Sequence, residues 1–367
     1  MTTTTQIEAR EAFADRLVEG VTHAMETISV HLGLELGLYR TIADVKSATP
    51  AEMARRAGIA ARYAREWLEQ QAVAGYLICE NQAEPPEHRR YRLPEEHRDV
   101  LVVEDSPYFA APLTQQFAGI TAVLPQLLAA YRTGAGVPFS AYGRDIRAGI
   151  AAGNRPMFLH ELAATWMPAM PEVHHRLLAA PPARVLDLGC GLGASSFALA
   201  AAYPQISVLG VDLDAASVVE ARTASVEAGV ANRVTFVVGE VADVAGVGPF
   251  ELVTMFEALH DMADPRAVLR SAGEVLSEGG SVLIADERVA DSFSAPGDLT
   301  ERLMYGWSIL HCLPATLAEG SLEANGTVLR APTVAGWAAD AGFADCQILP
   351  IENPFWRFYQ LSGYGRS

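Results

Sequence analysis

A short apolar strand that runs into a glycine-rich turn constrains this chain most. Residues 185–196 read Val-Leu-Asp-Leu-Gly-Cys-Gly-Leu-Gly-Ala-Ser-Ser, so an acid sits inside the strand and three glycines follow it. Gly189, Gly191 and Gly193 let the backbone turn sharply and let a ligand approach main-chain N–H groups at the start of a helix. A buried carboxylate is costly without a partner, so Asp187 has a specific partner to hold. The stretch predicts a cofactor site.

From residue 184 onward, apolar strands alternate with helical segments. This order predicts an α/β fold, a doubly wound Rossmann-like parallel sheet with helices on both faces. The expected parallel strands are 184–188, 207–212, 234–238, 252–256 and 281–285. Residues 278–280 are expected to turn a helix back into the sheet. Two closely spaced last strands, at 347–351 and 356–361, predict an antiparallel pair, because a parallel return needs a longer crossover.

The N-terminal part is helical by pattern. Residues 7–43 carry apolar side chains at helical spacing, and Thr49 and Glu52 form a capping box that starts a short helix. A helix at 60–74 and a predicted hairpin complete a winged-helix order. This order suggests DNA recognition, but the arginines of residues 49–98 are matched by glutamates, which favours packing or dimerisation.

The chain therefore divides into three predicted parts. Residues 1–99 form the N-terminal helical and winged-helix domain with a dimerisation role. Residues 100–180 form a helical linker that roofs the site. Residues 181–367 form the cofactor-binding domain, with a helical insertion at 290–330.

Composition excludes several classes of function. A formal net charge of −17 disfavours binding to polymeric nucleic acid, whose affinity comes largely from Lys and Arg. The four cysteines are scattered and predict neither a disulfide framework nor a zinc site. The chain has no run of 18 apolar residues and no signal-peptide pattern, so we expect a cytoplasmic protein without membrane contact.

A second acid supports the cofactor site. Asp212 lies 25 residues after Asp187, at the end of the second predicted strand, where a carboxylate can accept hydrogen bonds from ribose hydroxyls. The glycines alone also fit a dinucleotide fingerprint. Three features favour a sulfonium nucleoside instead: the acid inside the first strand, the third glycine, and the closing antiparallel pair.

Three stretches of the chain resemble the motifs of class I S-adenosylmethionine-dependent methyltransferases. They are Val185–Gly193 for the glycine motif, Gly210–Asp214 for the acidic motif and Val238–Val241 for the adenine-contacting turn. The likeness extends to a bacterial group with an N-terminal winged-helix domain. The segments similar to that group are 62–72, 259–262 and 310–313.

The resemblance implies S-adenosylmethionine as the cofactor. Asp187 and the loop amides would face its methionine moiety, Asp212 its ribose, and Glu240 with Val241 its adenine, although Asp243 lies close enough to replace Glu240. Trp166 offers an aromatic face to the sulfonium. The cofactor-binding residues expected are Asp187, Gly189, Gly191, Gly193, Asp212, Leu213, Glu240, Val241, Phe256 and Trp166.

The reacting end is expected after the fourth strand. His260 is the candidate general base or acceptor-positioning residue, because imidazole titrates near neutral pH and Asp261 or Glu257 can orient it. His311, in the inserted helices, is a second candidate contact. A sharper hypothesis makes His260 and His311 ligands of one metal ion, as in similar methyltransferases that methylate carbon in α-keto acids. Two histidines make a weak metal site, so no metal is expected.

We therefore expect a homodimeric methyltransferase of secondary metabolism that acts on O, N or C of a small, partly apolar molecule. The alternatives are the metal-dependent C-methyltransferase and a cofactor-sensing regulator in which the winged helix reports to DNA.

Overall fold

The computed structural model of the chain describes residues 4–321 and 323–365, which form two compact units. The first unit consists of the residues up to 118 together with 148–156, and the second of residues 119–147 and those from 157 onward. Helices α6 (Pro112–Ala122) and α8 (Gly143–Met157) continue from one unit into the other. The three-part division by role, 1–99, 100–180 and 181–367, stays a prediction.

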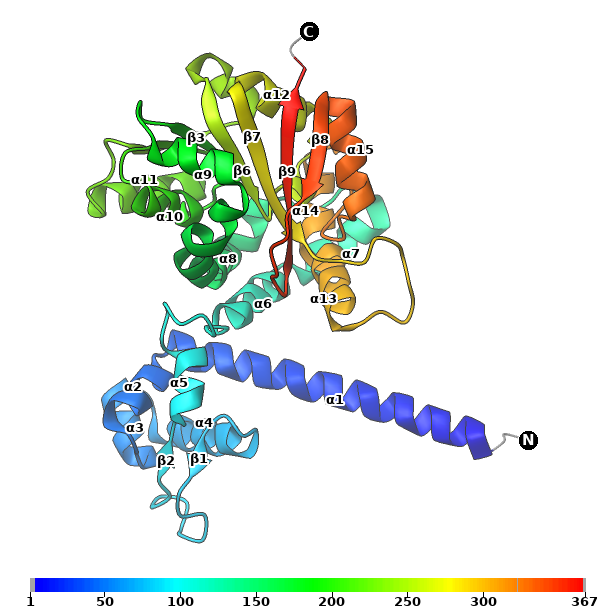
Figure 1. Cartoon of the computed structure of the whole chain (residues 1–367). Helices are drawn as coiled ribbons and strands as arrows, with labels where there is room; N and C mark the ends of the chain where they lie inside the picture. The colour runs from blue at the N-terminus through cyan, green and yellow to red at the C-terminus, as the bar shows by residue number, and fades with distance from the viewer. Residues whose placement is uncertain (1–3, 322, 366–367) are drawn as a thin grey trace. The chain divides into compact units, whose positions relative to one another are not determined.

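The first unit is a helical domain with a small hairpin (Figure 1). Its remaining elements are α1 (Thr4–Glu35), α2 (Leu38–Val45), α3 (Pro50–Ala57), α4 (Ala61–Val73), β1 (Ile78–Cys79), β2 (Tyr91–Arg92) and α5 (Glu95–Leu101). The capping box is confirmed: Thr49 Oγ1 accepts the Glu52 N–H, and Glu52 Oε2 accepts the Thr49 N–H at 2.9 Å. The antiparallel β1–β2 pair after α4 gives the winged-helix order that the sequence predicts.

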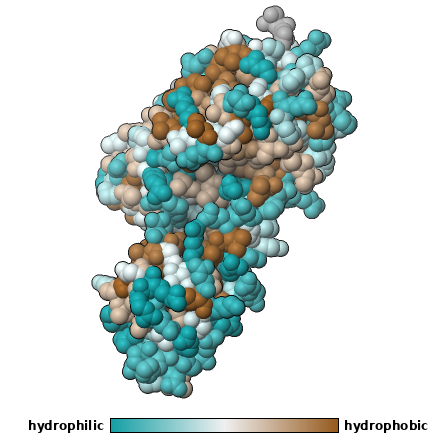
Figure 2. Space-filling view, turned by 90° about the vertical axis from the view of Figure 1, so that its left-hand side faces the viewer, coloured by the Kyte–Doolittle hydropathy of each residue, from teal (hydrophilic) through white to brown (hydrophobic). Residues whose placement is uncertain are grey.

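One stretch of α1 packs on α4, and the rest of the helix is exposed. The Trp67 indole N–H donates to the Ser29 carbonyl at 3.1 Å, and the rings of Tyr39 and Trp67 meet edge to face. The loop between β1 and β2 projects from the lower end of this unit in Figure 1, and the surface there is hydrophilic in Figure 2. Arg89, Arg90 and Arg92 at this hairpin each pair with a glutamate. The charge balance read from the sequence therefore exists as ion pairs.

The second unit is built on a seven-stranded sheet whose order is β5-β4-β3-β6-β7-β9-β8. Its strands are β3 (Arg184–Leu188), β4 (Ser207–Asp212), β5 (Val234–Val238), β6 (Phe250–Phe256), β7 (Leu276–Glu287), β8 (Phe343–Ile348) and β9 (Trp356–Tyr364). The first five are parallel, and β9 runs antiparallel to both β7 and β8. The doubly wound fold class and the antiparallel closing pair are confirmed.

Helices cover both faces of this sheet (Figure 1). Helices α9 (Pro171–Leu178), α10 (Ala194–Ala202) and α11 (Ala215–Glu227) pack on one face, and α12 (Pro265–Val275) and α15 (Ala331–Ala341) on the other. The remaining helical segments are α7 (Leu124–Thr133), η1 (Phe139–Tyr142), η2 (Phe158–Trp166), η3 (Met167–Ala169), η4 (Val241–Val247), η5 (Leu259–Asp261), α13 (Leu299–Trp307), η6 (Ser308–Cys312) and α14 (Leu313–Ala318). The helical insertion expected between 290 and 330 is present as α13, η6 and α14.

The structure differs from the sequence prediction at two strands. Residues 278–280, expected as a turn, belong to β7, whose pairing with β6 shifts register between Phe250 and Leu252. The strand expected at 347–351 is β8, which ends at Ile348. Glycines at the start of β7 misled the first prediction, because glycine is more typical of turns. The second prediction ran through Pro350, which has no N–H for a strand ladder, and β8 ends before it.

Two short helices, η2 and η6, are π-helical. Such wide turns are rare and occur mostly at functional sites. No helix among the described residues is both long and apolar enough to cross a membrane.

Candidate active site

The glycine turn after β3 has the geometry expected of a ligand-binding loop. Gly189, Gly191 and Gly193 have φ angles of 68°, 50° and 84°, a region that side chains with a Cβ rarely adopt. A Cβ on Gly189 would lie 2.6 Å from the Ala258 side chain, whereas a Cβ on Gly191 would meet no atom within 4 Å. At Gly189 and Gly193, both the positive φ angle and the close neighbours exclude a side chain. At Gly191 the space that a Cβ would occupy is open.

Asp187 stabilises this turn through hydrogen bonds to three side chains. Its Oδ2 accepts hydrogen bonds from Ser195 and Ser196 at 2.6 Å each, and its Oδ1 accepts from Thr254 at 2.7 Å. Burial raises the pKa of Asp187, and the three hydroxyl groups oppose that shift. The specific partners expected for this buried acid are hydroxyls of β6 and α10. The contact predicted between Asp187 and a methionine moiety stays a prediction.

Asp212 joins the turn to the end of β4. Its Oδ2 accepts the Gly191 N–H at 2.7 Å and its Oδ1 accepts the Asp214 N–H at 2.8 Å. Burial raises the pKa of Asp212, while these two backbone bonds lower it. Leu213, next in the chain, is exposed. A half-buried carboxylate beside an open glycine position is suited to bind hydroxyl groups of a ligand.

The turn after β5 joins two neighbouring acids in a capping box. Asp243 Oδ2 accepts the Glu240 N–H at 2.8 Å, and the Glu240 side chain accepts the Asp243 N–H at the start of η4. Both side chains are exposed, and Val241 between them is buried. The assignment of the adenine contact to Glu240 rather than to Asp243 stays a prediction.

His260 and Asp286 form a buried hydrogen-bonded pair at the carboxyl ends of β6 and β7. The His260 Nδ1 atom lies 2.8 Å from Asp286 Oδ1, and the two side chains are 3% and 1% exposed. The His260 backbone N–H also donates to Asp286 Oδ2 at 3.3 Å. On the other side of the ring, Nε2 lies 3.4 Å from Asp261 Oδ1. Asp286 thus fixes the Nδ1 atom of His260, and Nε2 is the ring nitrogen that could accept a proton from a substrate.

The carboxylates around His260 determine its charge. Burial lowers the pKa of His260, but Asp286 and Asp261 outweigh that effect and hold the pKa well above its ordinary value. From the sequence, Asp261 and Glu257 are the expected partners of His260, and Asp286 is not. The available signal was an acidic pair, Asp286 and Glu287, at the carboxyl end of an apolar strand, where ligands bind in open α/β sheets.

His311 lies in the π-turn η6 and packs edge to face against Phe139 and Tyr142. Burial lowers the pKa of His311, and its Nε2 atom is buried without a hydrogen-bond partner in the described part of the chain. Within the same part, the side chains close enough to share one metal ion are His260, Asp261 and Cys312, whose ligand atoms lie within 4.8 Å of one another. The structure thus brings Cys312, which sequence reasoning treated as a plain buried thiol, to His260.

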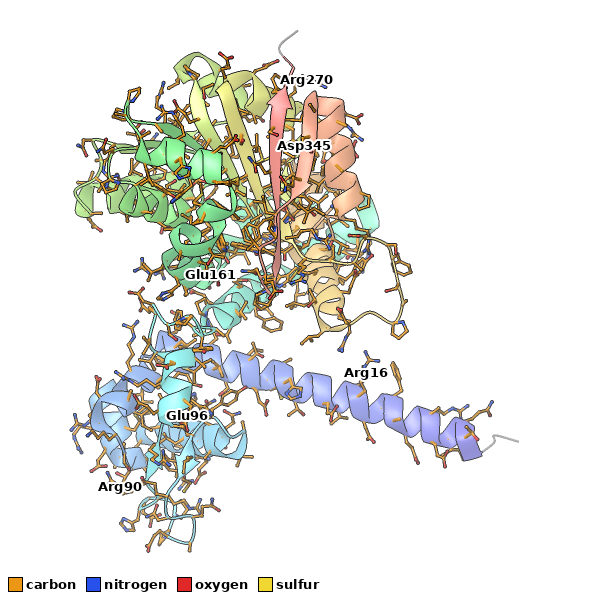
Figure 3. All side chains as sticks on the ribbon, viewed as in Figure 1. Arg16, Arg90, Glu96, Glu161, Arg270 and Asp345 are labelled. Carbon is orange, nitrogen blue, oxygen red and sulfur yellow. The ribbon has the colours of Figure 1, made fainter. Side chains whose placement is uncertain are left out.

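Phe256 and Trp166 lie in an aromatic cluster on one face of the sheet. The Trp166 ring centroid is 4.9–5.9 Å from those of Phe158, Phe256, Trp356 and Phe358. The Trp166 indole N–H donates at 3.1 Å to Glu161, which is labelled in Figure 3. A contact between Trp166 and a sulfonium stays a prediction, and it requires one of these rings to move.

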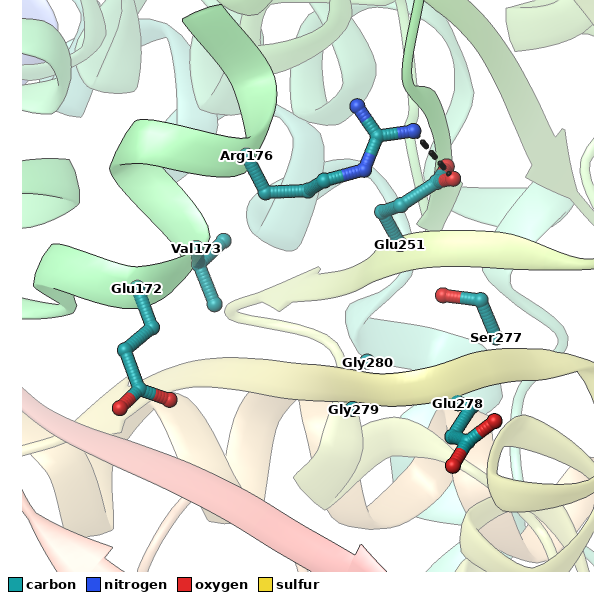
Figure 4. Close-up of a pocket in the computed structure, with 8 residues that line it drawn as sticks. All are labelled: Glu172, Val173, Arg176, Glu251, Ser277, Glu278, Gly279 and Gly280. Carbon is teal, nitrogen blue, oxygen red and sulfur yellow. Dashed lines mark hydrogen bonds and ion pairs between the residues drawn. The ribbon is translucent and has the colours of Figure 1, made fainter. Parts of the chain in front are cut away.

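A shallow pocket at the opposite edge of the sheet is not part of this site. It is lined by Glu172, Val173, Arg176, Glu251, Ser277, Glu278, Gly279 and Gly280 (Figure 4). Arg176 pairs there with Glu251 at 2.8 Å, so the only cation of the lining is neutralised. These residues lie near the start of β6 and β7, whereas His260 and the glycine turn lie at the strands' carboxyl ends.

Comparison with known proteins decides the family. A family model described as a methyltransferase domain matches residues 181–322, and one described as an Rv2258c-like winged HTH domain matches residues 24–102. A ubiquinone biosynthesis O-methyltransferase of Pseudomonas aeruginosa is 34% identical over 180 residues, which are 49% of this chain and 72% of that protein. The chain belongs to the S-adenosylmethionine-dependent methyltransferases. The family resemblance stated from the sequence is confirmed.

Other relatives of this methyltransferase match a smaller share. A ubiquinone biosynthesis O-methyltransferase of Xanthomonas campestris pv. campestris is 37% identical over 110 residues, 29% of this chain and 44% of that protein. The chain thus spans less than half the length of that relative.

Solved structures show that the fold extends over nearly the whole chain. Human N-acetylserotonin methyltransferase in complex with SAM has a TM-score of 0.69 at 18% identity, with 95% of this chain and 97% of that chain covered. The mitomycin 7-O-methyltransferase has a TM-score of 0.67 at 17% identity, with 97% and 100% covered. Both likenesses support the fold of each unit and the order of the two units along the chain.

Proposed function

We propose that this protein is an O-methyltransferase that moves the methyl group of S-adenosylmethionine to a hydroxyl group of a small, partly apolar molecule. The observation that carries the proposal is the buried His260–Asp286 hydrogen bond of 2.8 Å at the carboxyl ends of β6 and β7. A hydroxyl group needs a base in order to attack, and a histidine fixed through Nδ1 presents Nε2 for that purpose. The relatives named as O-methyltransferases support the same choice of atom.

Different residues at the strand ends are assigned to different parts of S-adenosylmethionine. The amides of the glycine turn and Asp187 are assigned to the methionine end of the cofactor, Asp212 to the ribose hydroxyls, and Glu240 with Val241 to the adenine. Leu213 and Phe256 are assigned to the apolar walls of the same site. When bound, S-adenosylmethionine supplies the methyl group, whose bond to sulfur breaks as the acceptor oxygen bonds to carbon.

The chain's own task in the step is proton transfer. His260 Nε2 takes the hydroxyl proton as the acceptor oxygen attacks, and Asp286 stabilises the imidazolium that forms. Asp261, 3.4 Å from Nε2, lies on the side where the acceptor hydroxyl must approach. His311, buried without a partner for Nε2, is assigned to the acceptor.

The proposal is tested by incubating the purified protein with S-adenosylmethionine and a panel of phenols, aliphatic alcohols, amines and α-keto acids. We expect a product heavier by one methyl group from at least one hydroxylated compound, detected by mass spectrometry. Methylation only of amines or of carbon contradicts the assignment of oxygen, and no transfer with tight cofactor binding contradicts the enzyme itself.

One observation favours a second candidate, a metal-dependent C-methyltransferase of an α-keto acid. His260, Asp261 and Cys312 offer an imidazole, a carboxylate and a thiol within 4.8 Å of one another, and Asp286 orients the histidine as outer-shell partners of metal ligands do. In the same incubation a chelator separates the two candidates. Activity that survives chelation supports His260 as the base, whereas activity restored only by added Fe²⁺ supports the second candidate.

We also propose that the protein is a homodimer located in the cytoplasm. The support for a dimer is α1, whose apolar side chains Phe13, Leu17, Val21 and Met25 are 57–66% exposed and lie close to helical spacing. The support for the location is that all four cysteines are free thiols. A double substitution, Leu17→Asp with Val21→Asp, should convert the dimer to a monomer in light scattering. A wild-type monomer at micromolar concentration contradicts the dimer.

A further inference from the structure

A second polar group lies beside the His260–Asp286 pair and has no task in the methyl transfer proposed above. Glu287 is the last residue of β7, and Trp356 is the first residue of β9. The two are paired positions of the antiparallel β7–β9 ladder, so their side chains stand next to each other on one face of the sheet. Both are buried, with 4% and 1% of their surfaces exposed.

Each of the two side chains carries an atom without a partner. Glu287 Oε2 and Trp356 Nε1 are buried and make no hydrogen bond within the described residues. Buried polar atoms in native proteins are nearly always hydrogen-bonded, because leaving one unpaired is costly. An acceptor and a donor left open side by side therefore indicate a ligand that supplies the missing groups.

The other contact of Glu287 explains why Oε2 is an acceptor. Its carboxyl group hydrogen-bonds with that of Glu257, which requires one shared proton. Burial, followed by the charge of Glu257, raises the pKa of Glu287 well above its ordinary value, so the proton is retained. Glu257 has a φ of 48° and donates its N–H to the Ala285 carbonyl at 2.8 Å, which holds it against β7. An anionic ligand is disfavoured here, because the acids nearby repel it.

The surroundings of Trp356 are flat and apolar. The Phe256 ring stacks on Trp356 with an interplanar angle of 24°, and Phe158 lies 5.8 Å from the Trp356 centroid. Such walls accept a planar molecule better than a bulky one.

We propose that Glu287 and Trp356 recognise the methyl acceptor, and that this acceptor is a neutral planar molecule with a carbonyl oxygen and an N–H on one edge, such as a lactam. Trp356 Nε1 donates to the carbonyl oxygen and Glu287 Oε2 accepts from the N–H. This inference rests on the proposed function, because it names the substrate class of the same site.

Two probes that differ in one N–H test the proposal. The lactam 6-hydroxyquinolin-2-one carries the N–H, and 6-hydroxycoumarin has a ring oxygen in its place; both are phenols that are neutral at pH 7. Binding to the protein loaded with S-adenosylhomocysteine is measured by calorimetry, and methylation by mass spectrometry. We expect the wild type to prefer the lactam about tenfold or more, because a site built around an N–H rejects an analogue that lacks it.

The variants are Glu287→Met, which keeps the length of the side chain and removes the acceptor, and Trp356→Phe, which keeps an aromatic ring and removes the donor. Glu287→Met should bring the lactam preference close to one. Trp356→Phe should weaken the binding of both probes alike, because both carry the carbonyl oxygen, and the cofactor Kd should change little in either variant. Trp337→Phe is the matched control, because Trp337 is buried against the opposite face of the sheet and should leave the preference intact. Both tryptophan substitutions remove buried ring atoms and should lower the Tm of the ligand-free protein. A loss for Trp356→Phe no larger than that for Trp337→Phe, together with weaker probe binding, distinguishes recognition from a structural role.

A wild type that binds both probes equally, or that binds no lactam, overturns the inference. So does a preference that persists in Glu287→Met, or probe binding that Trp356→Phe leaves unchanged. If other hydroxylated compounds are still methylated in those cases, the proposed function stands and only the substrate class is wrong. If the protein binds cofactor but methylates nothing, the proposed function fails as well.

Discussion

Replacement of His260 with alanine should lower kcat by about 10²–10⁴-fold, the usual contribution of a positioned general base. His260 is 3% exposed and presents Nε2 at the carboxyl end of β6, whereas burial lowers the pKa of His311, the other histidine assigned to the acceptor. The imidazole of His311 is therefore a weaker base than that of His260 and should replace it poorly. The Kd for S-adenosylmethionine, measured by calorimetry, should change little because His260 is assigned to the acceptor and not to the cofactor.

The control for this substitution is His23→Ala, which removes a histidine that is 75% exposed on α1. It should leave both kcat and the cofactor Kd unchanged. If His260→Ala retains turnover within about threefold of the wild type, proton transfer through His260 is wrong. If the cofactor Kd rises together with the loss of kcat, His260 has a binding role instead.

The cofactor half of the site could be predicted from the sequence because its signals are local. Asp187 and the glycines lie within seven residues of one another, so strand, acid and turn can be read together. Their conformations follow directly, with positive φ at all three glycines. Asp212 required one further step, because parallel neighbours β3 and β4 bring strand ends together.

The reacting half depends on register, which the sequence does not reveal. Asp286 lies 26 residues after His260 and meets it only because Phe256 pairs with Ala285 across β6 and β7. Glu257 and Asp261, which are close in sequence, were the more obvious partners. Cys312 reaches His260 through the π-turn η6, and a widened turn has no signature in apolar periodicity.

The same dependence on pairing applies to Glu287 and Trp356. They are 69 residues apart, and only the antiparallel register of β7 with β9 makes them neighbours. The aromatic residues around them, Phe158, Trp166 and Phe256, follow apolar patterns that predict core packing, which is what the structure contains. The unpaired polar atoms inside that core are visible only once the packing is known.

Replacement of Asp286 with asparagine should lower kcat/KM by about 10²-fold or more and should also move its pH dependence. Only the neutral imidazole accepts a proton, so the rate rises as pH rises through the pKa of His260. In the wild type Asp286 and Asp261 hold that pKa well above 6.5, which puts the rising limb on the alkaline side of that value. Without the Asp286 charge, burial is opposed only by Asp261 and Cys312, and the limb should move to lower pH.

The kcat/KM of the variant should therefore fall least below that of the wild type at acidic pH. It should fall most at alkaline pH, where His260 of the wild type is already neutral. Asp345→Asn is the matched control, because it removes one exposed carboxylate of β8 and leaves His260 untouched (Figure 3). Its pH profile of kcat/KM should coincide with that of the wild type. If the rising limb of Asp286→Asn keeps its position, the group that titrates is not His260, and the base must be sought elsewhere at the strand ends. A limb that moves while the cofactor Kd stays constant ties the proton transfer to the His260–Asp286 pair.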